Sequence, residues 1–347
     1  MAIMRATGAR DERKTMSKAA KRRVAIACQG GGSHAAFAAG VLMELMEPRH
    51  FERIELAALS GTSGGAVCAS LAWSGLVQPG GGPARAAERL AAFWDDLSAQ
   101  DPFDAIVNFW SVSLARLPVT WEVSPYSGFA PAEPRLRALL ERHMVWPAPG
   151  ERRNPPEIFI GATDVLAGKG IAFDSAGLGI DQIIASAAVP PLFRAIPVDG
   201  HLYWDGLFSR NPPIREFTNL PQPPDEVWVI RINPLEIKEE PKTMSQIVDR
   251  RNELSGNLAL DQELFFIEKI NELRQENELL QQRYRHIEVR QVELALDLDY
   301  PSKLDRSVPH IHRLIETGRS VAALFFEPPS RGKARIRSLA TPAPEPA

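Results

Sequence analysis

Apolar runs that end in glycine-rich turns are the most regular pattern in the first part of the chain. The runs Val24–Cys28 and Ile54–Ser60 are each followed by glycines and then by a segment of small and apolar residues, Ser33–Met46 or Ala66–Trp73. Short apolar runs bounded by glycines are typical of buried strands, and the segments after them suit helices. The pattern therefore predicts two successive strand–loop–helix units.

Further along the chain, apolar runs and periodic segments follow one another less regularly. We expect strands over Glu157–Thr163, Gly170–Asp174, Glu226–Ile232 and His286–Leu294, and helices over Ala84–Leu97, about Thr243–Arg283 and Arg306–Phe326. In the longest helical stretch, Phe266, Ile270 and Leu273 recur at helical spacing and predict a helix docked on its own domain, broken near Ser255–Gly256. An oligomer contact along this helix is the alternative.

Composition agrees with one large α/β domain. The chain has 347 residues, of which 44% are hydrophobic and 24% are charged, so it can bury a sizeable core. Its net charge of -3 predicts no general affinity for nucleic acid or for anionic membranes. The two cysteines, Cys28 and Cys68, fall on a predicted strand and helix, where they suit a core in a reducing compartment better than a disulfide or metal site.

The ends of the chain read differently from its middle. We predict a disordered basic tail over residues 1–22, a main domain over 23–327 with a helical extension at about 243–284, and a disordered tail over 328–347. The basic N-terminal segment lacks the apolar stretch of a secretory signal, and weak contact with lipid headgroups is the alternative to simple disorder. No run approaches the ~20 apolar residues of a membrane span, so we expect a cytoplasmic protein.

The segment Gly61-Thr62-Ser63-Gly64-Gly65 is the first candidate for chemistry. A serine in a Gly-x-Ser-x-Gly frame, between a strand and a helix, is typical of a nucleophile elbow. Glycine is needed at Gly61 and Gly65 because a Cβ there would collide with the adjoining strand and helix. The Ser63 hydroxyl is then exposed at a helix N-terminus, which favours a developing negative charge.

A second glycine cluster, Gly30-Gly31-Gly32, lies between the first predicted strand and its helix. Consecutive glycines let backbone N–H groups approach an oxyanion or a phosphate without a side chain in the way. A dinucleotide fold would place an acidic residue at the end of the second strand, but the chain has Ser60-Gly61-Thr62-Ser63 there. The cluster therefore fits an oxyanion loop better than a nucleotide site.

A third segment, Tyr203-Trp204-Asp205-Gly206, reads as a short strand that enters a loop. On its own, Asp-Gly is a common turn former. In this order, however, the three segments resemble the motifs of the patatin-like phospholipase family, and Ala185–Phe193 resembles the segment that this family carries ahead of its aspartate. The resemblance spans roughly Arg23 to Ile232 and implies a three-layer α/β/α fold with a mostly parallel central sheet and additional C-terminal helices.

The resemblance also implies an activity, that of a phospholipase-like or lipase-like serine hydrolase that cleaves acyl esters of lipids through an acyl-enzyme. Ser63 would be the nucleophile and Asp205 its base, with Gly30, Gly31 and Gly32 as the oxyanion hole. Gly61 and Gly65 would shape the elbow, and Gly206 the loop of the dyad aspartate. No metal or cofactor is needed. The expected partner is a lipid or acyl-ester substrate, with transient contact with a lipid surface and self-assembly into a homo-oligomer as open alternatives.

Two positions depart from the family pattern. The family usually follows its glycines with one residue, then Arg or Lys, then Gly, whereas this chain has Ser33, His34 and Ala35. Because histidine is largely neutral at pH 7, any charge at His34 is weak or pH-dependent, unless the ring serves only for packing. Leu207 stands where a second glycine often follows Asp-Gly, which leaves the aspartate itself in place.

Alternative schemes use the same residues differently. A Ser-His-Asp triad would need His310 or His312, which no motif supports. An acyltransferase would use the same acyl-enzyme, and a lipid-binding protein with a weakened site would explain His34. Residues 101–131 are read as irregular and rich in apolar side chains: Phe103, Ile106, Phe109, Trp110, Leu114, Leu117 and Trp121. They fit a lid or acyl-chain channel, or else complete the core over the sheet.

Overall fold

The structure, a computed structural model, describes residues 21–115, 124–127, 132–147, 156–190, 192–296 and 298–326. The tail predicted over 328–347 lies outside these residues, as does the N-terminal tail except for Lys21 and Arg22. Arg22 already belongs to the first strand. The proposed division of the chain into tails and a main domain stays a prediction.

A mixed eight-stranded sheet forms the centre of the molecule, in the order β5-β6-β3-β2-β1-β7-β8, with β4 paired to β3. The strands are β1 (Arg22–Cys28), β2 (Ile54–Gly61), β3 (Glu157–Asp164), β4 (Lys169–Asp174), β5 (Ile196–Val198), β6 (His201–Asp205), β7 (Glu226–Arg231) and β8 (Glu288–Glu293). Strands β3, β2, β1, β7 and β8 are parallel to one another, whereas β4 and β6 pair antiparallel with β3, and β5 pairs antiparallel with β6. The predicted α/β fold class with a mostly parallel sheet is confirmed.

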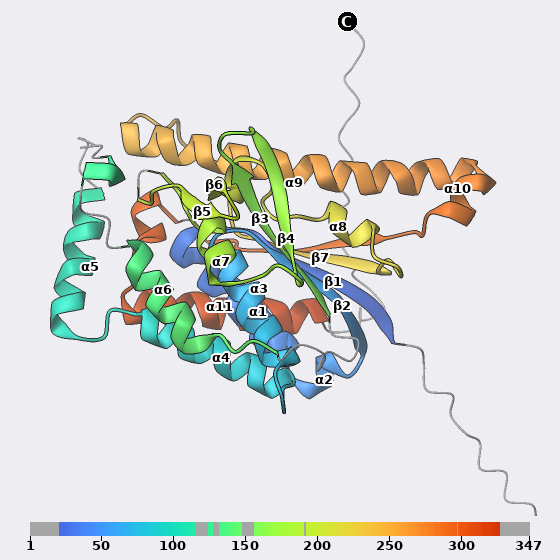
Figure 1. Cartoon of the computed structure of the whole chain (residues 1–347), viewed down its shortest axis with the longest axis horizontal. Helices are drawn as coiled ribbons and strands as arrows, with labels where there is room; N and C mark the ends of the chain where they lie inside the picture. Colours follow the sequence, from blue (N-terminus) through green and yellow to red (C-terminus); the bar gives the residue numbers. More distant parts are fainter. Residues whose placement is uncertain are drawn as a thin grey trace, which may run out of the picture.

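Helices cover both faces of this sheet (Figure 1). One face carries α1 (Ala36–Leu45), α3 (Gly64–Val77), α4 (Pro83–Leu97) and α11 (Val308–Phe326), and the other carries α8 (Arg215–Thr218) and α9 (Met244–Glu276). Alternate residues of β1 point to the two sides: Val24 and Ile26 pack in the larger core cluster, Ala25 and Ala27 in the smaller one. This alternation buries both faces of the strand and produces the three layers.

The long helix α9 differs from the prediction in two ways. It continues without a break through Gly256, where a Cβ would lie 2.4 Å from the side-chain nitrogen of Asn211. This glycine therefore serves a close approach and does not end the helix. The side of α9 that packs on the sheet carries Leu260, Leu264 and Ile267, whereas Phe266 and Leu273 of the predicted set are exposed. A short helix, α10 (Glu278–Arg283), follows.

The remaining helices are α2 (Pro48–Phe51), α5 (Pro102–Ala115), α6 (Ala132–His143) and α7 (Ile180–Ser186), with 3-10 turns η1 (Gly32–Ala35), η2 (Pro125–Ser127), η3 (Gly206–Phe208) and η4 (Tyr300–Lys303). Helix α5 corrects the expectation of an irregular segment. Asp101 accepts a hydrogen bond from the amide of Asp104, and Pro102 follows Asp101, which is a favourable start for a helix. The large apolar residues named above that fall in α5 are exposed, so they do not complete the core. Leu117 and Trp121 lie outside the described residues.

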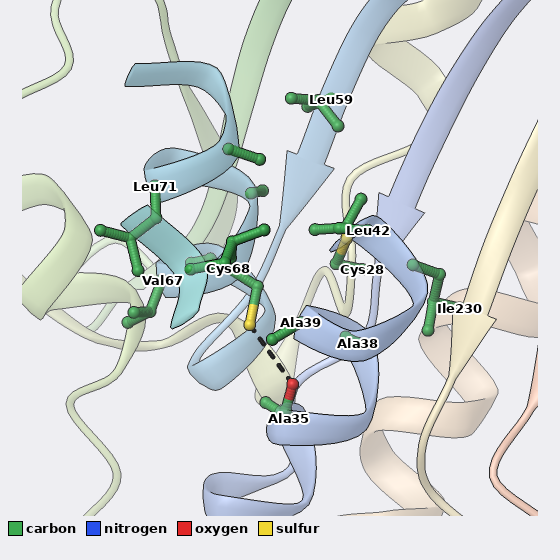
Figure 2. Packing of buried hydrophobic residues seen from close by; sticks show 14 of the residues in the cluster. Cys28, Ala35, Ala38, Ala39, Leu42, Leu59, Val67, Cys68, Leu71 and Ile230 are labelled. Carbon is green, nitrogen blue, oxygen red and sulfur yellow. Dashed lines mark hydrogen bonds between the residues drawn. The ribbon is translucent and has the colours of Figure 1, made fainter. Parts of the chain in front are cut away.

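Both cysteines lie in the main core, as predicted. Figure 2 shows Cys68 among buried residues of α1 and α3, with its thiol directed at the carbonyl oxygen of Ala35, 3.3 Å away. Burial raises the pKa of Cys68 to about 12, so its thiol stays protonated. Among the described helices, none combines the length and apolar character needed to cross a membrane.

Candidate active site

The three motif segments meet at one edge of the sheet. Strands β1 and β2 are parallel, with Cys28 opposite Gly61, so the loops that follow them leave side by side. Strand β3 is parallel to β2, and β6 returns antiparallel to β3 with Asp205 opposite Ala162. Because β3 extends past the last residue of β2, with Ile160 opposite Gly61, Asp205 lies just beyond the carboxyl end of β2, at the edge where ligands bind in open α/β sheets.

Ser63 occupies a strained turn between β2 and α3, where it is buried and not exposed as the sequence predicted. Its φ is +55°, a left-handed backbone conformation that side chains other than glycine rarely adopt. A Cβ at Gly61 would lie 2.3 Å from the carbonyl oxygen of Gly65, and one at Gly65 would lie 2.2 Å from that of Cys28. Gly61 and Gly65 are therefore required by close backbone contacts.

Ser186, which the sequence interpretation gave no role, supports this turn from α7. The Ser63 amide donates to both the carbonyl oxygen and Oγ of Ser186, each at 3.1 Å, and Ser186 Oγ donates to the carbonyl of Gly161 at 2.6 Å. On the other side, Thr62 Oγ1 donates to the carbonyl of Arg210 at 2.6 Å. These bonds satisfy the backbone of the strained turn and hold it in position.

The glycine loop lies directly against the nucleophile turn. A Cβ at Gly30 would lie 2.7 Å from Cβ of Ser63, and one at Gly64 would lie 2.8 Å from the carbonyl oxygen of Gly32. The amide of Gly30 donates to Oδ1 of Asn211 at 2.7 Å. Because this donor is engaged, Gly31 and Gly32 remain the candidate amide donors of the loop.

A buried carboxamide network anchors the loop, and no sequence motif pointed to it. Oε1 of Gln29 accepts from the amides of Ile232 and Asn233, each at 2.9 Å, and its Nε2 donates to Asn257 on α9 at 2.9 Å. Nδ2 of Asn233 donates to the carbonyl of Gly30 at 3.2 Å. Such fully paired amides hold a loop in one geometry.

Asp205 is completely buried at the end of β6. Its Oδ1 accepts from the amide of Leu207 at 2.8 Å, while Oδ2 has no hydrogen-bond partner among the described residues. Desolvation raises the pKa of Asp205 to about 7, although the Ser63 hydroxyl and the Leu207 amide favour the charged form. At Gly206, a Cβ would lie 2.6 Å from the carbonyl oxygen of Gly161, so glycine lets this turn close on β3.

His34 is buried and neutral. Burial, Lys303 and His310 lower its pKa to about 3, and its Nε2 forms a 2.7 Å hydrogen bond with Ser302 Oγ. A charge that titrates near neutral pH is therefore absent from this position. The ring centroid of His310 lies 6.1 Å from that of His34, and His312 is exposed on α11. Among the described residues, the groups that interact with the Asp205 carboxyl are Ser63 and Leu207, and neither histidine is one of them.

Comparisons with known proteins found a matching family model and several similar solved structures. A family model described as Patatin-like phospholipase matches residues 26–218. Among solved structures, VipD from Legionella pneumophila is similar at 12% identity and a TM-score of 0.40, over 88% of this chain and 67% of that one. The ExoU–SpcU complex of the Pseudomonas aeruginosa type III secretion system is similar at 13% identity and a TM-score of 0.34, over 87% of this chain and 52% of that one. The chain thus spans about half the length of its match in that complex. No curated protein matches the chain.

Proposed function

Because the chain belongs to the patatin-like phospholipase family, we propose that it hydrolyses acyl esters of lipids through an acyl-enzyme on Ser63, with Asp205 as the base. The Ser63 oxygen bonds the carbonyl carbon while its proton passes to Asp205. The tetrahedral intermediate then expels the alcohol, which takes that proton. In the deacylation half of the reaction, water adds to the acyl carbon and gives a proton to Asp205. The second tetrahedral intermediate then collapses, and the Ser63 oxygen leaves and takes this proton.

The observation that carries the proposal is the environment of Asp205. An aspartate with an ordinary pKa near 3.9 is a weak base, but burial raises this one to about 7. A base works best when its pKa lies near the operating pH. Ser63 and Asp205 do not form a hydrogen bond of regular geometry, which is common for catalytic pairs before substrate binds.

Stabilisation of the oxyanion is assigned to the backbone. Gly31 and Gly32 belong to the loop that packs against the nucleophile turn through Gly30 and the carbonyl oxygen of Gly32, so their amides are the proposed donors. Ser63 lies at the N-terminus of α3, where the helix dipole favours negative charge. Gly30 serves the loop indirectly, since its amide is held by Asn211. The neutral state of His34 supports this assignment, because the family's usual cation at that position is replaced by an uncharged ring.

A fluorophosphonate probe and a short-chain p-nitrophenyl ester test the proposal on the full chain. Ser63→Ala should abolish probe labelling and reduce ester turnover by about 10⁴-fold or more, as loss of a nucleophile does. Ser70→Ala is the matched control, because Ser70 is a buried serine of α3, the helix that Ser63 precedes, and its hydroxyl has no hydrogen-bond partner among the described residues. Labelling that persists in Ser63→Ala, or that disappears equally in the control, would reject Ser63 as the nucleophile.

A further inference from the structure

Helix α5 is folded with its polar side inward and its apolar side outward. Asp104, Asn108 and Val112 are its buried residues, whereas its large apolar side chains are exposed. The exposed set is Phe103, Ile106, Val107, Phe109, Trp110 and Leu114. We call this set the α5 apolar face. A surface helix normally buries its apolar stripe, so this arrangement is the reverse of the usual one.

Ion pairs and hydrogen bonds hold the helix in this orientation. The Asp104 carboxylate accepts hydrogen bonds from the two terminal guanidinium nitrogens of Arg135, at 2.8 and 2.5 Å. It also accepts from the two terminal nitrogens of Arg306, at 3.0 and 2.7 Å. Asn108 donates to Asp305 at 2.9 Å and accepts from the amide of Arg306 at 2.8 Å. Because these contacts are specific and paired, the outward direction of the apolar face is built into the fold.

The α5 apolar face is poor in groups that a protein partner would need. The sole charged residue of α5, Asp104, is buried, and the exposed Ser111 donates its hydroxyl to the carbonyl of Val107 in the same helix. Protein interfaces carry roughly one hydrogen bond per 100–200 Å². The interior of a lipid layer requires none, and Trp and Phe on an exposed helix suit its boundary.

The face is connected to the candidate active site through one short element. Asn108 forms hydrogen bonds with Asp305 and Arg306, which follow η4 after one intervening residue. Within η4, Ser302 bonds His34, and the carbonyl oxygen of Lys303 would lie 2.6 Å from a Cβ at Gly32. Figure 1 shows α5 at one end of the molecule, beyond α6 and far from α10. A lipid surface in contact with α5 would therefore adjoin the side of the molecule on which η1 lies.

We propose that the α5 apolar face docks the protein on a lipid layer by inserting its aromatic and aliphatic side chains. The choice of lipid as occupant rests on the proposed lipid hydrolase function, but docking itself requires no turnover. Because α5 exposes no charged side chain, insertion is driven by apolar burial and not by anionic headgroups. Binding to zwitterionic vesicles should therefore be as strong as to anionic ones, and nearly independent of salt.

The test measures co-sedimentation of the full-length Ser63→Ala protein with phosphatidylcholine vesicles, so that no lipid is hydrolysed. Phe109→Ser with Trp110→Ser should weaken partitioning by at least about tenfold. The control is Phe265→Ser with Phe266→Ser on α9, since those rings are 65% and 60% exposed against 65% and 59% for Phe109 and Trp110. This control should bind vesicles within about twofold of its parent.

Several results would overturn the proposal. They are absence of vesicle binding by the Ser63→Ala parent, equal losses in both double variants, or binding that requires anionic lipid. Sedimentation velocity tests a second copy of the chain as the rival occupant. If the parent forms an oligomer that the α5 double variant cannot form, and the parent does not bind vesicles, the face is an interface between copies of the chain. Phe103→Ser with Ile106→Ser, on the same face, repeats the test should the first variant unfold. Since binding is read without catalysis, loss of esterase activity and loss of docking are separate outcomes.

Discussion

Two buried aspartates in this molecule have opposite electrostatic surroundings. Asp104 on α5 meets the guanidinium groups of Arg135 and Arg306, which hold its pKa well below the usual range. Asp205 at the end of β6 forms no ion pair among the described residues, and desolvation raises its pKa to about 7. The same side chain is therefore a permanent anion in one place and a proton acceptor near neutral pH in the other. The neighbours decide which role a buried carboxylate can take.

The largest expected effect separates the two aspartates by catalysis. Asp205→Asn keeps the size of the side chain but removes the base, so ester turnover should fall by about 10²–10⁴-fold. Asp104→Asn, which lies outside the catalytic groups, should retain most turnover of a short soluble ester. Steady-state kinetics on both variants check this, and comparable losses would contradict the assignment of Asp205 as the base.

The pH dependence of turnover follows from the same contrast. Because Asp205 must be ionised to accept the Ser63 proton, kcat/KM should rise with pH through about 7 and level off above it. Below this value the slope should approach about tenfold per pH unit. A profile that is already flat from pH 5 to 8 would show that an ordinary carboxylate, or another group, acts as the base.

Stability should depend on pH with opposite signs at the two positions. The folded pKa of Asp205 lies above its ordinary value of 3.8, so its burial costs stability as pH rises from 3.8 to about 7, by at most about 1.4 kcal/mol per unit. Asp205→Asn should therefore unfold at a higher temperature than its parent at pH 8. Little difference is expected at pH 4.

The contribution of Asp104 to stability depends on pH with the opposite sign. Its folded pKa is depressed, so its contribution is present above pH 3.8 and is lost as pH falls through the folded value. Asp104→Asn should lower the free energy of unfolding by about 1–2 kcal/mol at pH 7, because two partly exposed arginines lose their shared partner. Hydrogen exchange across α5 should increase most. Denaturation at pH 7 and 3 measures the effect, and an unchanged stability at pH 7 would refute it.

The smallest effects are expected at the histidines. His34 is neutral because burial, Lys303 and His310 lower its pKa to about 3, so His34→Gln should leave the pH profile of turnover unchanged. His310→Gln with His312→Gln should change kcat by less than about threefold, since neither ring is among the described groups that interact with the Asp205 carboxyl. A folded double variant without activity would instead support a Ser-His-Asp triad.

The errors of the sequence interpretation share one physical cause. Residues 101–131 were expected to be irregular, yet Pro102–Ala115 forms helix α5, which Arg135 and Arg306 hold from distant parts of the chain. Likewise Ser186 supports Ser63, and Asn211 holds the amide of Gly30, across 123 and 181 residues of chain. Such partners are chosen by the folded sheet, and no local pattern encodes them.

What the sequence by itself determined were the features set by short-range sterics and hydrophobic patterning. Those are the buried strands, the glycines that only a tight turn requires, and the order of the three motifs that resemble the family. The tertiary structure alone decided which amides of the glycine loop are engaged, that His34 is neutral, and that Asp205 is a stronger base than a free aspartate. The reason is that desolvation and pairing are properties of the space around a group, and that space exists only after distant segments pack together.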